Sequence, residues 1–282
     1  MSCCFCIKTC KFNQEAIIRV GNGDSRPATI GQGLRQGCLL SPILFLVYSE
    51  MMMFEAMDGI EEGVKVGGKL IKDIRFADDQ GMTASSEEGL QRLMDALHNT
   101  AKEYNMKINM KKTKVMRISR EGAGAINIVI AGIKLEQVDQ FRYLGSLITS
   151  DGRCEQEIKT RIGMAKAAFN KRQELLSKSL CTALRKRMVK SLVWSVALYA
   201  SETWTLRQED IKRLQAFEMW VWRRMEKVSW RDKKTNEEVL EAIGEKRSLM
   251  DMIYKRKKNW IGHITRGDSL MKDVVEGRMI GK

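Results

Sequence analysis

Two adjacent acidic residues, Asp78 and Asp79, are the strongest candidates for metal chemistry in this sequence. The preceding residues 69–77 predict a strand, and residues 80–84 predict a second strand that returns beside it. Carboxylates held together on a turn repel each other unless a cation neutralises them, and their hard oxygens suit Mg²⁺ or Mn²⁺. The alternative interpretation is an ordinary solvent-exposed turn, where Asp is common.

Further motifs flank the acidic pair in a fixed order along the chain. GLRQGCLLSP occupies residues 33–42, NMKIN residues 105–109, KTK residues 112–114 and FRYLG residues 141–145. Together with FADD at residues 76–79, these blocks resemble the palm of the reverse transcriptases of retrotransposons without long terminal repeats, the LINE-like elements. The likeness covers about residues 17–150 and continues more loosely to WIGHI at residues 260–264.

The resemblance implies a fold, a reaction and partners. The expected fold is α+β: a partial polymerase palm with antiparallel strands and packed helices, followed by a basic helical thumb. The implied activity is that of an RNA-directed DNA polymerase, working by two-metal nucleotidyl transfer with Mg²⁺ or Mn²⁺. The implied partners are an RNA template, a DNA primer and deoxynucleoside triphosphates.

The resemblance also assigns roles to individual residues. Asp78 matches the metal-binding first Asp of the paired motif, and Asp79 its less direct neighbour. The match to the nucleotide-binding segments falls on Gln36, Gly37 and Lys112. The match to the hairpin that grips the primer falls on Phe141, Tyr143, Leu144 and Gly145. Strand alternation leaves a second interpretation open for Phe141 and Tyr143, which would be core residues.

One departure from the family pattern concerns the other essential Asp, which lies on a strand before the Gln36-Gly37 loop in such enzymes. Residues 1–32 contain only Glu15 and Asp24 as acids, and Asp24 falls in a turn. We therefore expect the chain to begin after the first catalytic Asp and to be inactive alone. The alternatives are a non-catalytic nucleic-acid-binding remnant of a transposon and a metal-dependent nuclease, although a nuclease needs no nucleotide-cradling loop.

Charge divides the chain near residue 152. Residues 1–152 have a net charge of +1 and residues 153–282 a net charge of +13. A basic helical half favours a polyanion such as nucleic acid as partner. The expected phosphate contacts are Arg185, Lys186, Arg187 and Lys190, on a helix whose apolar stripe would be Leu184, Met188, Leu192 and Val196. For Trp220, Trp222 and Trp230, a core position is favoured over base stacking.

Periodicity and turn signals predict the remaining elements. Residues 17–30 predict a hairpin, and residues 41–57 a helix with Ser41 as its cap. Ser85 and Glu88 suggest a capping box before a helix that reaches Tyr104. Further strands are expected at residues 113–118, 126–135 and 141–149, and helices at residues 155–178, 182–199, 208–224, 235–243 and 249–261.

Cysteine usage and hydropathy bear on location. The chain has 7 Cys and no evident secretory signal, which favours a reduced intracellular compartment, nuclear or cytoplasmic. Four Cys lie within residues 3–10 without a matching ligand pair, so ordinary thiols are favoured over a zinc site. No membrane span is expected, because the best apolar run, residues 38–48, is shorter than the roughly 20 residues required.

Overall fold

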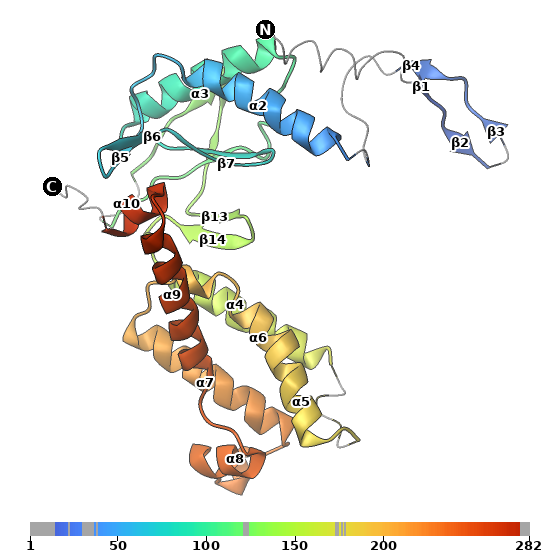
Figure 1. The fold of residues 1–282 in the computed structure, drawn as a ribbon, viewed down its shortest axis with the longest axis vertical. Helices are drawn as coiled ribbons and strands as arrows, with labels where there is room; N and C mark the ends of the chain where they lie inside the picture. Colours follow the sequence, from blue (N-terminus) through green and yellow to red (C-terminus); the bar gives the residue numbers. More distant parts are fainter. Residues whose placement is uncertain are drawn as a thin grey trace. The chain divides into compact units, whose positions relative to one another are not determined.

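The structure is a computed structural model that describes residues 15–21, 23–29, 37, 39–120, 124–172, 175, 177 and 179–276. Helices and short, mostly antiparallel strand pairs alternate along the chain, which confirms the α+β class (Figure 1). Contacts divide the chain into two compact units: residues 1–110 with 128–134, and residues 111–127 with 135–282. The predicted boundary at residue 152 follows charge rather than contacts and stays a prediction.

The first unit begins with the predicted hairpin. Strands β2 (Arg19–Val20) and β3 (Gly23–Asp24) pair antiparallel, and β1 (Glu15–Ala16) pairs with β4 (Ala28–Thr29). The Arg19 guanidinium lies 2.8 Å from an Asp24 carboxylate oxygen across the turn. Asp24 is therefore already paired with a cation within its own hairpin.

Two helices form the core of the first unit. They are α2 (Ser41–Met57) and α3 (Glu87–Glu103), whose buried side chains are Met52, Met53, Ala56, Met57, Leu93, Leu97 and Ala101. Both predicted helices are confirmed, but both predicted caps are wrong. Ser86 caps α3 by accepting a 3.0 Å hydrogen bond from the Gly89 amide, whereas Ser85 donates to the Gly63 carbonyl. In α2, Leu40 occupies the N-cap position and no side chain caps the helix.

The strands of the first unit form separate two-stranded ribbons. They are β5 (Val64–Val66) with β6 (Lys69–Ile71), β7 (Asp73–Phe76) with β8 (Asp79–Met82), and β10 (Val129–Ile130) with β11 (Ile133–Lys134). The single strands predicted at 69–77 and 126–135 are thus wrong. The first breaks at Lys72, where pairing passes from β5 to β8, and the second turns back at Ala131-Gly132, where both φ angles are positive.

The second unit opens with two small strand pairs. Strand β9 (Lys114–Val115) runs parallel to β12 (Glu136–Gln137), and β13 (Gln140–Tyr143) forms an antiparallel hairpin with β14 (Ser146–Thr149). The strand predicted at residues 141–149 is therefore a hairpin. Its turn is Leu144-Gly145, with φ angles of 48° and 82°. A two-residue turn with positive φ at both positions matches the right-handed twist of paired strands.

Helices make up the rest of the second unit and include all five that periodicity predicts, although the first of them ends at Asn170 rather than at residue 178. They are α4 (Glu155–Asn170), α5 (Thr182–Met188), the π-helix η2 (Val189–Val193), α6 (Trp194–Ala197), the 3₁₀ helices η3 (Ser201–Thr203) and η4 (Trp230–Asp232), α7 (Gln208–Met225), α8 (Asn236–Ile243), α9 (Leu249–Arg266) and α10 (Leu270–Glu276).

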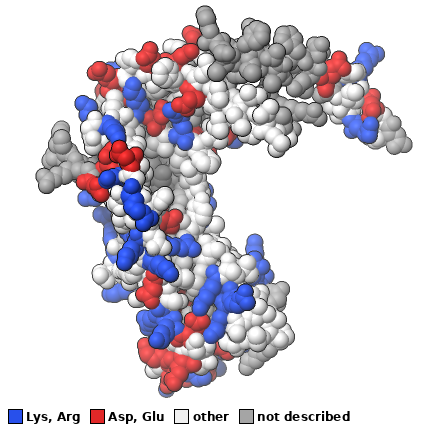
Figure 2. Space-filling model, viewed as in Figure 1, with Lys and Arg blue, Asp and Glu red and all other residues white. Residues whose placement is uncertain are grey.

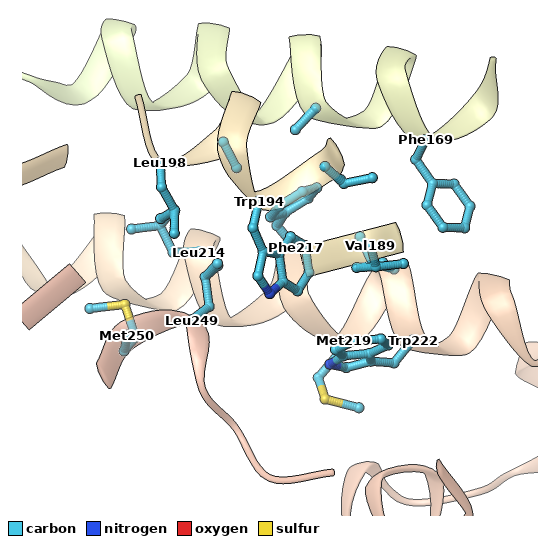
Figure 3. Close-up of a cluster of buried hydrophobic side chains, with 14 of the residues drawn as sticks. Phe169, Val189, Trp194, Leu198, Leu214, Phe217, Met219, Trp222, Leu249 and Met250 are labelled. Atoms are coloured by element: carbon cyan, nitrogen blue, oxygen red, sulfur yellow. The ribbon is translucent and has the colours of Figure 1, made fainter. Parts of the chain in front are cut away.

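These helices enclose an aromatic core. Trp194, Phe217 and Trp222 come from α6 and α7 and lie against one another, with ring centroids of both partners 5.6 Å from that of Trp194 (Figure 3). Trp222 is fully buried, so its predicted core position is confirmed.

Across the described residues, no helix combines the length and apolar character that crossing a membrane requires.

Candidate active site

The acidic pair lies at the turn between β7 and β8. Phe76 and Asp79 are register partners, so the turn consists of Ala77 and Asp78, with Ala77 at a φ of 53°. Asp79 is the first residue of β8, and both carboxylates are exposed. Neither side chain has a hydrogen bond or ion pair within the described residues, which leaves both carboxylates available to a ligand.

Several contacts anchor the base of this hairpin to α2 and β6. The Lys72 ammonium donates to the Met57 carbonyl at 2.9 Å, and the Thr83 hydroxyl donates to the Ile71 carbonyl at 2.8 Å. Arg75 reaches Glu50 of α2 at 2.6 Å and Asp73 at 3.1 Å. Because Arg75 pairs with these two acids, its charge is engaged below the turn rather than at its tip.

A hollow of about 450 Å³ lies between α2 and this turn. Its lining includes Leu46, Val47, Glu50, Arg75 and Ala77. The side chains on the same strand are unusually exposed for their type, with Phe76 62% and Ile74 52% accessible. The turn therefore stands on an apolar surface that the described residues of the first unit do not cover.

The acidic pair suits a divalent cation in its chemistry but not in its number of ligands. Adjacent exposed carboxylates offer hard oxygens, and Mg²⁺ keeps several waters when a protein supplies only one or two carboxylates. Among the described residues, no group of three or more acidic, His or Cys side chains is arranged so that it could hold a metal ion. The pair thus fits one side of a metal site, and a two-ion site needs further ligands.

The candidate nucleotide-binding residues fall in different places. Gln36 lies outside the described residues, so nothing bears on its predicted role. Gly37 has a φ of 86°, a conformation that favours glycine, and a Cβ there would meet no atom within 4 Å. Lys112 is exposed two residues before β9 and belongs to the second unit.

The candidate primer-grip residues form the β13–β14 hairpin, whose turn is firmly held. The Tyr199 hydroxyl donates to the Leu144 carbonyl at 2.9 Å, and the Arg161 guanidinium donates to the Gly145 carbonyl. A Cβ at Gly145 would lie 3.4 Å from the Tyr199 hydroxyl and would also strain a φ of 82°. That distance is an ordinary van der Waals contact, so the positive φ is what favours glycine at this position.

A buried ion pair supports this hairpin from α4. Arg161 pairs with Glu157 at 2.6 Å, and Glu157 also accepts a 2.9 Å hydrogen bond from the Leu147 amide of β14. The Arg161 guanidinium lies 4.3 Å from the centre of the Tyr199 ring. Our sequence analysis missed all three residues, although Glu157 and Arg161 show the i, i+4 spacing of a helical ion pair.

The hairpin also shows how exposed Phe141 and Tyr143 are, the two residues for which a core position was the alternative to primer contact. Phe141 is 37% accessible, so it is not a core residue, and Tyr143 is half-buried. Leu144 at the turn is 42% accessible. The hairpin thus presents apolar side chains from a turn that α4 and the segment after α6 hold in place, and their contact with a primer stays a prediction.

The prediction that Arg185 contacts phosphate is wrong, because this residue is buried. Arg185 is 3% accessible, donates to the Met225 carbonyl at 3.0 Å and pairs with Glu226 at 3.0 Å. Lys186 and Lys190 both pair with Glu245, at 3.4 and 2.8 Å. Arg187 is exposed and has no ion pair or side-chain hydrogen bond among the described residues, so it is the member of the group best placed for a phosphate.

Arg185 is buried because the buried face of this helical segment is shifted by one residue from the predicted apolar stripe. The predicted stripe began at Leu184, but Leu184 is 42% accessible, and the buried positions are Arg185, Val189, Val193, Trp194, Ala197 and Leu198. Apolar residues occur at both 188–189 and 192–193, so the sequence is compatible with either face. Burial of Trp194 selects the face that carries Arg185.

Elsewhere, cations remain on the surface of the second unit. Figure 2 shows Lys and Arg side chains over its helices, with Asp and Glu side chains gathered near α8. In the cluster at residues 255–258, Arg256 donates to the Leu198 carbonyl and Lys257 to the Trp204 carbonyl, both at 2.7 Å. Part of the basic charge therefore holds the fold together.

Comparison with known proteins identifies the family. The sequence matches the reverse transcriptase (RNA-dependent DNA polymerase) family over residues 3–148. A transposon-derived protein of Caenorhabditis elegans is 26% identical over 208 residues, which are 72% of this chain and 75% of that protein. The Pol polyprotein of the type-2 retrotransposable element R2DM of Drosophila melanogaster is 27% identical over 206 residues, which are 67% of this chain and 19% of the polyprotein.

A third relative points to the same group of elements. The RNA-directed DNA polymerase from the mobile element jockey of Drosophila funebris is 24% identical over 120 residues, which are 42% of this chain and 13% of that protein. Because the family match covers more than half of the chain, the chain belongs to the reverse transcriptase family. The predicted kinship with LINE-like retrotransposons is confirmed. The chain spans about a fifth or less of these two fly proteins.

Proposed function

We propose that this chain carries one carboxylate side of the nucleotidyl-transfer site of a retrotransposon reverse transcriptase. The observation that supports it most is the exposed, unpaired Asp78-Asp79 turn in a chain of this family. In the reaction, the primer 3′-hydroxyl attacks the α-phosphorus of a deoxynucleoside triphosphate. The new P–O bond forms as the bond to pyrophosphate breaks. The template would be RNA and the primer DNA.

Each side chain has a task that its chemistry suits. Asp78 and Asp79 would hold divalent cations, Mg²⁺ or Mn²⁺, which bring the reacting oxygens together and neutralise charge on the phosphates. Lys112 would hold the triphosphate as a point charge. Gln36 and Gly37 would line the nucleotide, with Gly37 allowing close approach of the backbone. Residues 141–145 would hold the primer end.

The second unit would hold the template–primer duplex by its phosphates. The exposed cations Arg187 and Lys190, and the half-buried Lys186, would contribute charge without reading sequence. Arg185 would instead position the helix that carries them, through its contacts with Met225 and Glu226. Binding of this kind weakens steeply with salt, because counterions are released from the nucleic acid.

The chain by itself is expected to lack activity because its described residues supply only one pair of carboxylates. Without a facing carboxylate the second ion has no fixed position, and Mg²⁺ tolerates loose geometry poorly. The alternative function is that of a non-catalytic nucleic-acid-binding remnant of a transposon. The two functions share the basic helical unit and differ only in whether Asp78 matters.

Primer extension on a poly(rA) template with Mg²⁺ separates the two. Three proteins are compared: this chain, a chain extended with the upstream fingers and first palm strand of a related element, and the extended chain with Asp78→Asn. We expect extension only with the second protein. Activity of the chain alone would refute the missing-ligand argument, and full activity of Asp78→Asn would remove Asp78 from the reaction. Binding without extension by both longer proteins favours the remnant.

A further inference from the structure

A second hollow, of about 460 Å³, lies along one face of α7 in the second unit. Its lining includes five α7 residues at spacings of three, four and one: Lys212, Gln215, Met219, Trp220 and Arg223. These spacings place the side chains on one helix face. From Lys212 to Arg223 the face is about 17 Å long, at the roughly 1.5 Å rise of an α-helix.

Positive charge surrounds this hollow. Its charged lining residues are Lys212, Arg223 and Arg247, and no described carboxylate belongs to the lining. Lys212 is exposed and has no side-chain partner in the described part of the chain. Arg223 is held in place, donating to the Lys234 carbonyl at 2.8 Å. Arg247 lies 3.7 Å from the exposed carboxylate of Glu237. Exposed pairs of this kind contribute little, so the hollow keeps its attraction for an anion.

Trp220 places an aromatic surface in this basic hollow. It is half-buried, whereas Trp194, Trp204 and Trp222 are almost wholly buried. Phe217 stacks near it with a ring angle of 17° and a centroid distance of 6.4 Å, and Phe169 meets it edge-on at 5.5 Å. These two rings hold the indole in one orientation.

Two more cations lie over the Trp220 ring. The Lys166 ammonium is 5.2 Å and the Arg224 guanidinium 5.6 Å from the ring centroid. Cations beside an aromatic surface are the combination with which proteins hold single strands, since a base stacks on the ring while its phosphates meet the charges. A base in a duplex is stacked between its neighbours, so its faces are less accessible to an indole.

We propose that this hollow binds a short single-stranded segment of nucleic acid. One base contacts Trp220, and the adjacent phosphates meet Lys212, Arg223 and Arg247. Gln215, which also belongs to the lining, offers an amide group to base edges without requiring one sequence. The Asn236 side-chain oxygen accepts a 3.0 Å hydrogen bond from Arg223, which leaves its NH₂ group for a base. The inference rests on the proposed function in one respect, that the chain meets a template with a single-stranded part.

The test is binding of the full chain to fluorescently labelled single-stranded oligo(U) and, in parallel, to a blunt RNA–DNA hybrid. The variants are Lys212→Glu, Trp220→Leu and Trp220→Phe, with Lys65→Glu as a matched control for charge. Lys65 is exposed on β5 in the first unit and has no side-chain partner among the described residues. Thermal unfolding of each protein shows whether Trp220→Leu disturbs the packing with Phe169 and Phe217.

We expect Lys212→Glu and Trp220→Leu each to weaken oligo(U) binding on the order of tenfold, as loss of one stacked base or phosphate contact does. Trp220→Phe should retain most of the affinity, and Lys65→Glu should match the unchanged chain. Hybrid binding should change much less. If Trp220→Leu unfolds the protein, the comparison of oligo(U) affinity between Lys212→Glu and Lys65→Glu tests the proposal instead.

Three outcomes overturn the inference. The first is unchanged oligo(U) binding in Lys212→Glu and Trp220→Leu. The second is an equal loss for hybrid and single strand, which means a charge effect without stacking. The third is displacement of oligo(U) by polyglutamate with no sensitivity to Trp220→Leu, which indicates a site for acidic peptides. Primer extension plays no part in these assays, so each outcome is independent of the test of Asp78.

Discussion

The two compact units of this protein differ in how they treat their apolar residues. The second unit buries a cluster of 22 described residues that includes three Trp, whereas the main cluster of the first has seven, drawn from two helices. In the first unit, large apolar side chains stay exposed, among them Leu39 at 92%, Phe54 at 75% and, beside the acidic turn, Phe76 at 62%. Large exposed apolar patches are typical of surfaces that bind another segment or molecule.

This difference suggests that the residues that stabilise the fold and the residues that could carry out the reaction lie in different parts of the molecule. The candidate catalytic carboxylates lie on a two-stranded ribbon that hydrogen bonds and ion pairs hold at its base. The candidate nucleic-acid contacts lie on helices with a closed aromatic core. Substitutions in the buried core of the second unit should therefore act on folding, and substitutions at the acidic turn should act on the reaction while leaving stability nearly unchanged.

The largest effect is expected for Trp222→Ala. Removing a fully buried indole from a packed core costs about 3–5 kcal/mol, and the change should lower the free energy of unfolding of the second unit. Denaturation followed by residue-level amide exchange measures it, and protection should fall in α4, α6 and α7. If protection in α2 and α3 fell equally, the two units would unfold together and the contrast between them would not hold.

Arg185→Ala should come next. The change leaves the half-buried Glu226 carboxylate without its partner and the Met225 carbonyl without its donor, which should cost about 2–3 kcal/mol. Arg187→Ala, two residues away and exposed, is the matched control and should change stability by less than about 0.5 kcal/mol. Urea denaturation of both variants is the measurement. Equal stability of the two would mean that Arg185 is not buried in solution.

Glu218 offers a test through pH. Burial raises the pKa of its carboxyl, although the Ser248 and Leu249 amides donate to it at 2.8 and 3.1 Å. The folded protein thus holds this proton to a higher pH than the unfolded chain does. The stabilisation that comes from protonated Glu218 is therefore present at low pH. It falls as the pH rises from about 4.5 through the raised pKa of this carboxyl.

Glu218→Gln keeps an oxygen for the two amides and has no charge to desolvate. We expect the free energy of unfolding of this variant to lose the part of its pH dependence that comes from residue 218. Glu218→Ala should cost about 1–3 kcal/mol at all pH values, because the amides at the start of α9 lose their acceptor. Unfolding curves between pH 4 and pH 8 measure both, and an unchanged slope in Glu218→Gln would assign the titration to another group.

The smallest effect on stability is expected for Asp78→Asn. The carboxylate is exposed and unpaired, so its neutralisation should change the free energy of unfolding by no more than about 0.5 kcal/mol. Thermal unfolding with and without Mg²⁺ checks this. A large loss of stability without Mg²⁺ would show that Asp78 supports the fold, and the separation of stability from chemistry would fail for the first unit.

The amino-acid sequence alone was sufficient for the family, the α+β class and most helices. The order of the motifs between residues 33 and 145 carries the family, and strong 3.6-residue periodicity predicted α3, α7 and α9. The sequence also placed Asp78 at a turn between strands, because a local hydrogen-bonded ribbon depends on nearby residues. It misplaced the turn by one residue, since the turn is Ala77-Asp78 and Asp79 begins β8. These features are all determined by short-range chemistry.

Only the tertiary structure decided which side chains are used to hold the fold. Local sequence allowed two buried faces for residues 184–198, and packing of Trp194 against α7 selected the face that buries Arg185. Likewise, Glu157 and Arg161 read as an ordinary helical ion pair until β14 and the turn at Gly145 lie against them. A charge's role depends on what desolvates and pairs it, and those partners are 10 to 41 residues away in the chain.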